Sequence, residues 1–278
     1  MDAITKKQLE QIACKVRIGI IEGVHAAKAG HPGGSLSIAE ILTYLYFKEM
    51  NVDPKDPKNL KRDRFVLSKG HAAPALYATL AQRGFFSPDE LLTLRQIGSR
   101  LQGHPDMINI PGVVMSTGSL GQGNSAAVGM ALSSKHFGDN YNVYTILGDG
   151  EIEEGQVWEA AMFASNKGLS NLTAFIDLNN LQIDGTIDEV NSAKPIDKKF
   201  EAFGWHVITI DGHDYDAIED ALAKAKTIDK PVAIIAETVK GKGVSYMENA
   251  VNWHGSAPND EQYEVAMQEL NAALAAFN

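Results

Sequence analysis

The sequence contains a single cysteine, Cys14, among 278 residues, and it has no long apolar segment. One cysteine excludes an intramolecular disulfide and a cysteine-based metal cluster. No apolar run approaches the roughly 18 residues that a membrane span needs, and the N-terminal residues have no hydrophobic signal-peptide core. The sequence therefore predicts a cytoplasmic protein with no membrane partner.

Basic residues are also few, because 25 Lys and Arg stand against 35 Asp and Glu, which gives a net charge of −10. An acidic balance argues against a nucleic-acid partner. Hydrophobic residues make up 44% and charged residues 22%, which is typical of a globular protein. We predict a single domain over residues 1–278.

Two short aliphatic runs with a helix between them form the centre of the predicted fold. Residues 143–147 and 172–176 are predicted strands, and residues 154–167 are a predicted helix that Gly168 ends. Strand, helix and strand of this length form a right-handed βαβ unit with parallel strands. Further strands are predicted at 64–68, 204–210 and 231–237. Five strands separated by helices predict an α/β fold: a doubly wound, mainly parallel sheet with helices on both faces.

Polar residues follow the two central strands where each strand ends. Asp149 lies between two glycines after the first strand, and Asn179 follows the second. Carboxylate and amide oxygens are hard ligands that suit Mg²⁺ or Ca²⁺. Gly150 lets a ligand approach the backbone closely, and the predicted helix that starts near Glu154 directs its amino end toward an anion. The pattern predicts a site for a divalent cation and a diphosphate at the carboxyl edge of the sheet.

The Gly-Asp-Gly at 148–150, followed after residues 151–178 by Asn-Asn, is similar to the thiamine diphosphate signature. Residues 148–185 resemble the transketolase family. The resemblance implies thiamine diphosphate and Mg²⁺ as cofactors, with Ca²⁺ or Mn²⁺ as substitutes. It implies Asp149, Asn179 and the backbone carbonyl of Leu181 as metal ligands, and it places Ile183 against the thiazolium ring.

Four histidines lie in separate loops that are similar to transketolase motifs: His31 in GHPGG, His71 in SKGH, His104 in GHP and His254 in WHGSAP. From the residues alone, a structural role is favoured for His31, and His104 is explained by a solvated surface loop. The resemblance implies instead that all four are catalytic. His71 would contact the cofactor diphosphate, and His254 the diphosphate and the transferring group. His31 would reach both substrate and cofactor, and His104 would bond sugar hydroxyls.

Other candidate cofactor residues also come from the resemblance. The loop TGSLGQG implies that Gly118 and Leu120 contact the aminopyrimidine ring, and Gly150 is assigned to the diphosphate. Asp177 would support the metal site, although a turn acid at a strand end is an equal alternative. Glu154 would join a carboxylate network that links the two active sites of a dimer.

Several charged and titratable residues receive no functional role. Glu151 and Glu153 are predicted to be solvated at the start of the helix, where acidic residues are favoured. No role is predicted for Lys69. His206 and His213 belong to no motif, and we expect them to be structural.

The last part of the sequence predicts a long loop over 238–258 and an amphipathic helix over 259–278. Long loops in compact domains are often functional. In transketolases the carboxylic acid that acts on the pyrimidine ring lies in a second domain, on the neighbouring subunit. No such domain follows His254, so the resemblance identifies the chain as the amino-terminal subunit of a split transketolase.

This identification implies a partner and an activity. A C-terminal subunit with a pyrimidine-binding domain would supply the glutamate, in an assembly expected to be α2β2. Together the chains would transfer a two-carbon ketol unit from a ketose phosphate to an aldose phosphate. Two alternatives remain: the α subunit of a 2-oxo acid dehydrogenase E1, and a non-catalytic module that keeps the cofactor site. The GHPGG, SKGH and GSLGQG loops favour the transketolase.

Overall fold

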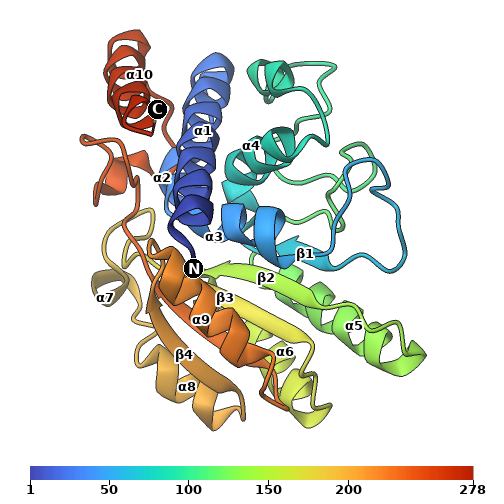
Figure 1. Cartoon of the computed structure of the whole chain (residues 1–278). Coiled ribbons are helices and arrows are strands. Elements are labelled where there is room, and N and C mark those ends of the chain that lie inside the picture. The colour runs from blue at the N-terminus through green and yellow to red at the C-terminus, as the bar shows by residue number, and fades with distance from the viewer. Residues whose placement is uncertain (278) are drawn as a thin grey trace.

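The computed structural model describes residues 1–277, which form one five-stranded sheet with helices on both faces (Figure 1). The strands are β1 (Arg64–Leu67), β2 (Val143–Gly148), β3 (Leu172–Leu178), β4 (His206–Asp211) and β5 (Val232–Glu237). Their order in the sheet is β1-β2-β3-β5-β4, and every pair is parallel. The predicted doubly wound parallel sheet is confirmed.

Helices precede, connect and follow the strands. The α-helices are α1 (Ala3–Ala27), α2 (Pro32–Leu36), α3 (Ala39–Tyr44), α4 (Ala73–Arg83), α5 (Gln122–Phe137), α6 (Gly155–Asn166), α7 (Ile187–Val190), α8 (Ile196–Ala202), α9 (Tyr215–Ala225) and α10 (Asp260–Ala275). A π-helical turn, η1 (Leu45–Glu49), extends α3. Short 3₁₀ turns occur at η2 (Gly70–Ala72), η3 (Pro88–Thr93), η4 (Glu151–Glu153) and η5 (Val251–Trp253).

The alternation of side chains along each strand divides the interior into two cores. On β2, Tyr144 and Ile146 belong to the core that packs beneath α1, α3, α4 and α9. Val143 and Leu147 belong to the core that packs beneath α5, α6 and α8. Successive residues of a strand point to opposite faces, so a continuous apolar run fills both cores.

Three details differ from the prediction. The helix after β2 starts at Gly155, because the 3₁₀ turn η4 lies between it and the glycines. The short helices α7 and α8 between β3 and β4 were not predicted. The last helix, α10, spans Asp260–Ala275 and packs on α1, and Asn278 of the predicted segment lies outside the described residues.

The carboxyl ends of β2 and β3 lie side by side, as predicted. Gly148 pairs with Asp177 in the sheet, and the N–H of Asp149 donates to the carbonyl of Asp177 over 3.3 Å. The fold thus brings the two polar clusters to one edge of the sheet.

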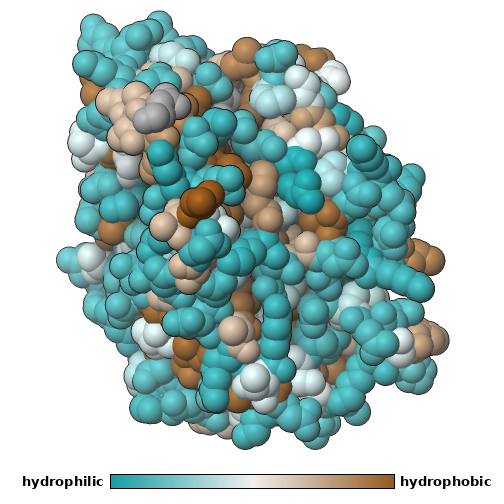
Figure 2. Space-filling view, viewed as in Figure 1, coloured by the Kyte–Doolittle hydropathy of each residue, from teal (hydrophilic) through white to brown (hydrophobic). Residues whose placement is uncertain are grey.

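The face seen in Figure 2 is mostly hydrophilic with scattered apolar side chains. Within residues 1–277, no helix is long and apolar enough to cross a membrane.

Candidate cofactor site

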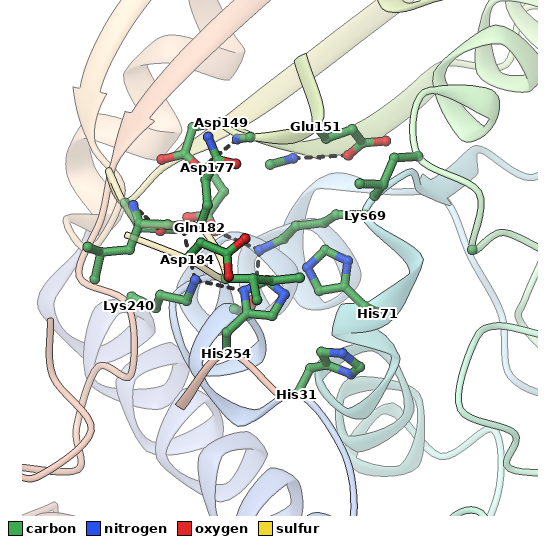
Figure 3. A pocket seen from close by; sticks show the side chains of 18 residues that line it. His31, Lys69, His71, Asp149, Glu151, Asp177, Gln182, Asp184, Lys240 and His254 are labelled. Atoms are coloured by element: carbon green, nitrogen blue, oxygen red, sulfur yellow. Dashed lines mark hydrogen bonds and ion pairs between the residues drawn. The ribbon is translucent and has the colours of Figure 1, made fainter. Parts of the chain in front are cut away.

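A cavity of about 330 Å³ lies at this carboxyl edge (Figure 3). Its size is within the range of small-molecule sites in proteins. It brings together most of the predicted site residues: His31, His71, Gly118, Leu120, Asp149, Gly150, Asp177, Asn179, Leu181, Ile183 and His254. Loops after four different strands, β1, β2, β3 and β5, and the loops before α2 and α5 contribute to it, so distant parts of the sequence meet in one site.

The side chains of the candidate cation ligands are held by hydrogen bonds with nearby backbone N–H groups and with a neighbouring side chain. Asp149 is buried and accepts hydrogen bonds from the N–H of Gly150 at 2.9 Å and of Asn180 at 2.5 Å. The amide nitrogen of Asn179 donates to Asp177 over 2.8 Å, which identifies Oδ1 as the acceptor end. Within residues 1–277 that oxygen accepts only the N–H of Leu181, at 3.2 Å, and keeps a lone pair for a cation.

The donor set fits a hard cation. Within residues 1–277, no group of three or more His, Cys, Asp and Glu is placed to hold a metal. The cavity instead offers the carboxylate of Asp149, the amide oxygen of Asn179 and the carbonyl of Leu181. Oxygen donors of this kind fit Mg²⁺ or Ca²⁺ and do not fit a structural zinc site.

Burial of Asp149 gives a pH prediction. Burial, with a further contribution from the charge of Asp177, raises the pKa of Asp149 to about 7. A cation binds the ionised carboxylate, so we expect Mg²⁺ affinity to fall as the pH drops below about 7 and Mg²⁺ binding to release a proton at about pH 6. Calorimetry in two buffers with different ionisation enthalpies measures that release. Proton release that is equal at about pH 6 and about pH 8.5 would contradict the assignment.

Asp177 is fully buried and connects four segments. Its Oδ2 accepts from Lys69 Nζ at 2.6 Å, from Ser37 Oγ at 2.8 Å and from Asn179, while Oδ1 accepts from Thr238 Oγ1 at 2.5 Å. Burial by itself would raise the pKa of Asp177, but the Lys69 ammonium and the hydrogen bonds from Lys69, Thr238 and Ser37 together outweigh it, and the pKa is lowered. The carboxylate thereby orients the side-chain amide of Asn179.

Lys240 was not predicted to be a site residue. It is 2% exposed and lines the cavity. Its Nζ donates to the carbonyl of Leu181 over 2.8 Å and lies 2.9 Å from Nδ1 of His254 (Figure 3). Burial lowers its pKa to about 8, and Lys69 adds to the effect while Asp149 opposes it. Within residues 1–277 no carboxylate lies within ion-pair distance of this ammonium group, so its charge can serve an anion.

Three of the predicted histidines form a triangle. Ring centroids are 5.3 Å apart for His31 and His71, 5.5 Å for His31 and His254, and 5.2 Å for His71 and His254. Burial, reinforced by neighbouring cationic groups, lowers the pKa of His31 to about 4 and of His254 to about 3, and lowers that of His71 well below its usual value. All three rings are neutral at pH 7, and each can donate one hydrogen bond and accept another. Nδ1 of His31 is buried without a partner in the described part of the chain.

His104 and Glu154 do not line the cavity. His104 is exposed, and its ring packs 3.2 Å from where a Cβ on Gly118 would lie. Glu154 is exposed at the start of α6, beside Gly121. Both residues therefore flank the glycine-rich loop, outside the cavity itself.

The prediction that Glu151 is solvated was wrong. Glu151 is 2% exposed and accepts from Ser68 Oγ at 2.5 Å and from the N–H groups of Gly121 at 2.9 Å and Gly148 at 3.0 Å. It fixes the glycine-rich loop to the ends of β1 and β2. Glu153 is half-buried and accepts a hydrogen bond from Gln182. The sequence carried no signal for the burial of Glu151, because acidic residues are favoured at the start of a helix whether that start is exposed or buried.

The fold and the cavity define a class of protein: a parallel α/β domain with a cavity at the carboxyl edge of its sheet, lined by both oxygen donors and cationic side chains. Residues 8–275 match the family described as transketolase, thiamine diphosphate binding domain. The chain therefore belongs to the transketolase family.

Relatives place the chain within that family. It is 48% identical to the 6-deoxy-6-sulfo-D-fructose transketolase subunit SqwG of Clostridium sp., over 94% of this chain and 96% of that protein. It is 47% identical to one of the subunits of the apulose-4-phosphate transketolase of Phocaeicola vulgatus, over 96% of this chain and 95% of that protein. Human transketolase is 44% identical over 96% of this chain, but the match spans only 42% of the human protein.

Solved structures agree with the sequence comparisons. The crystal structure of transketolase from Campylobacter jejuni has a TM-score of 0.90 and 32% identity, and it covers 100% of this chain and 46% of that chain. The chain thus corresponds to less than half of a full-length transketolase and to nearly the whole of the proteins named as transketolase subunits.

Proposed function

We propose that this chain is the cofactor-binding, amino-terminal subunit of a two-chain transketolase. With a C-terminal subunit it transfers a two-carbon ketol unit from a ketose phosphate to an aldose phosphate. The observation that carries the proposal is the convergence of His31, His71 and His254 on the cavity that also holds Asp149 and Asn179. Nearly full-length similarity to two transketolase subunits supports the two-chain form.

The residues divide into two groups around the cavity. Asp149, Asn179 and the carbonyl of Leu181 would hold Mg²⁺, which in turn holds the diphosphate of thiamine diphosphate. Lys240 and His71 would contact the diphosphate directly, because an ammonium group and an N–H donor both suit anionic oxygens. Thiamine diphosphate, when bound, supplies the electron sink for ketol transfer.

The neutral imidazoles act on the substrate. His31 and His254 can each donate to or accept from a sugar hydroxyl, and can take up or return a proton during transfer. His104, at the rim, would contact the part of the sugar that extends out of the cavity. The C-terminal subunit would contribute the glutamate that activates the pyrimidine ring, in an α2β2 assembly.

Reconstitution tests the proposal. We expect the purified chain to show no measurable ketol transfer, and the chain mixed with its C-terminal partner to transfer ketol units only when thiamine diphosphate and Mg²⁺ are present. Donors should include phosphorylated ketoses, apulose 4-phosphate and 6-deoxy-6-sulfo-D-fructose, since the relatives are named for different sugars. Pyruvate decarboxylation by the pair would instead identify a 2-oxo acid dehydrogenase component, and full activity of the chain alone would refute the two-chain form.

A further inference from the structure

A buried ion pair outside the cavity lining joins α1 to α3. Arg17 Nη1 lies 2.7 Å from Glu40 Oε1, and Nη2 lies 2.7 Å from Oε2, so the contact is bidentate. Both side chains are buried. Burial raises the pKa of Glu40, but Arg17 and His213 outweigh it and bring the pKa to about 2. The proposed reaction makes no use of this pair.

His213, in the turn between β4 and α9, connects the ion pair to the 238–258 loop. Its Nδ1 lies 2.9 Å from Glu40 Oε2, and its Nε2 accepts the N–H of Val239 at 2.9 Å. The ionised carboxylate can only accept, and the backbone N–H can only donate. The geometry therefore assigns the ring proton to Nδ1, and both ring nitrogens are used.

Arg17 and a backbone hydrogen bond hold the loop on the other side of Lys240. Arg17 Nε donates to the carbonyl of Lys242 over 2.9 Å, and the N–H of Gly241 donates to the carbonyl of Gly33 over 3.0 Å. Residues 239, 241 and 242 are thus each fixed by a hydrogen bond from a distant part of the chain. The side chain of Lys240 extends from between these fixed points into the cavity.

We propose that His213 is a positioning residue: braced by Arg17 and Glu40, it fixes the backbone at Val239 and thereby sets the position of the Lys240 ammonium in the cofactor site. A lysine has a flexible four-carbon stem, so its placement depends on the backbone that carries it. The loop is long and carries little secondary structure of its own, so its position depends on such anchors. The inference rests on the proposed function only in taking Lys240 as a contact of the cofactor diphosphate.

Two substitutions of His213 separate the hydrogen bond that Nε2 accepts from the other contacts of the ring. His213→Gln can place an amide oxygen where Nε2 accepts the N–H of Val239. His213→Asn keeps a donor near Glu40 but cannot reach Val239. His206→Asn, on the preceding strand, is the matched control, because His206 makes no contact with the loop among the described side-chain hydrogen bonds.

The first measurement does not depend on the cofactor. Amide hydrogen exchange of the assembled protein without thiamine diphosphate should show about tenfold faster exchange across residues 239–242 in His213→Asn, as expected for the loss of one hydrogen bond. Exchange in His213→Gln and His206→Asn should stay near that of the parent protein. Equal exchange in all four proteins would overturn the proposal.

The second measurement is a double-mutant cycle on thiamine diphosphate affinity at saturating Mg²⁺. We expect His213→Asn to weaken binding about tenfold, His213→Gln to restore most of it, and His213→Asn to have no further effect in a Lys240→Met background. Additive losses would show that His213 acts by another route and would overturn the proposal. Absence of thiamine diphosphate binding by the parent protein would refute the proposed function, and the exchange measurement would still decide whether His213 fixes the loop.

Discussion

Replacing Asp149 with asparagine is expected to weaken Mg²⁺ binding by more than about 100-fold, and thiamine diphosphate binding with it. Outer-shell residues of metal sites already account for about 10–100-fold in affinity, and Asp149 is the one carboxylate in the candidate ligand set of the described chain. Asp184→Asn is the matched control, because Asp184 lines the cavity at its exposed rim. Calorimetric titration of each variant with Mg²⁺ and cofactor measures the effect.

Without metal, Asp149→Asn should raise the thermal stability of the protein rather than weaken it. The pKa of Asp149 is raised from 3.8 to about 7, so the folded state favours the protonated acid. That stabilisation is complete below about pH 4 and is lost as the pH rises through about 7. At about pH 8 in EDTA, Asp149→Asn should therefore melt above the parent protein, and below it once Mg²⁺ and thiamine diphosphate are added. Melting curves that keep the same order in both conditions would argue against a cation site at Asp149.

The adjacency of the two central strands and the edge that carries the site could be predicted from the sequence. Residues 143–147 and 172–176 are aliphatic runs that end in polar residues, and parallel strands joined by a helix must end at the same edge. That local pattern was enough to bring Asp149 and Asn179 together. The oxygen character of the donors then restricted the choice of metal.

The buried charges of the site could not be predicted in this way. Lysine and glutamate are rarely fully buried, so a local pattern assigns them to the surface. Lys69 is buried because Asp177, distant in the sequence, supplies its counter-charge, and Glu151 is buried because Ser68 and two backbone N–H groups surround it. Lys240 lies in a loop without periodicity. These placements depend on tertiary contacts that no window of sequence contains.

The structural role expected for His213 shows a related limit. The residue does hold the structure together, as its contacts with Glu40 and Val239 show. What the sequence could not indicate is which part of the protein it holds. Its hydrogen bonds end on the backbone beside Lys240, so a residue without a motif is connected to the site through two elements far apart in the chain.

Replacing Lys69 with methionine is expected to destabilise the fold by about 3–5 kcal/mol, the usual cost of removing one partner from a buried ion pair. The Lys69 and Asp177 side chains are 2% and 0% exposed and their charged atoms are 2.6 Å apart. Without the ammonium group, the carboxylate of Asp177 stays buried with neutral partners alone. Lys194→Met is the control, because Lys194 forms a pair of similar length, 2.7 Å, with Asp188 at the surface. Its loss should cost no more than about 1 kcal/mol.

A second substitution distinguishes charge from packing. In the double variant Lys69→Met and Asp177→Asn, the amide that replaces the carboxylate keeps hydrogen-bonding partners in Ser37 and Thr238 and carries no charge. We therefore expect the double variant to recover most of the stability that Lys69→Met loses, as measured by the midpoint of urea unfolding. If Asp177→Asn instead lowers stability further, the cost of Lys69→Met comes from lost packing of the lysine stem. In that case the hydroxyl partners Ser37 and Thr238 contribute more to holding Asp177 than the charge of Lys69 does.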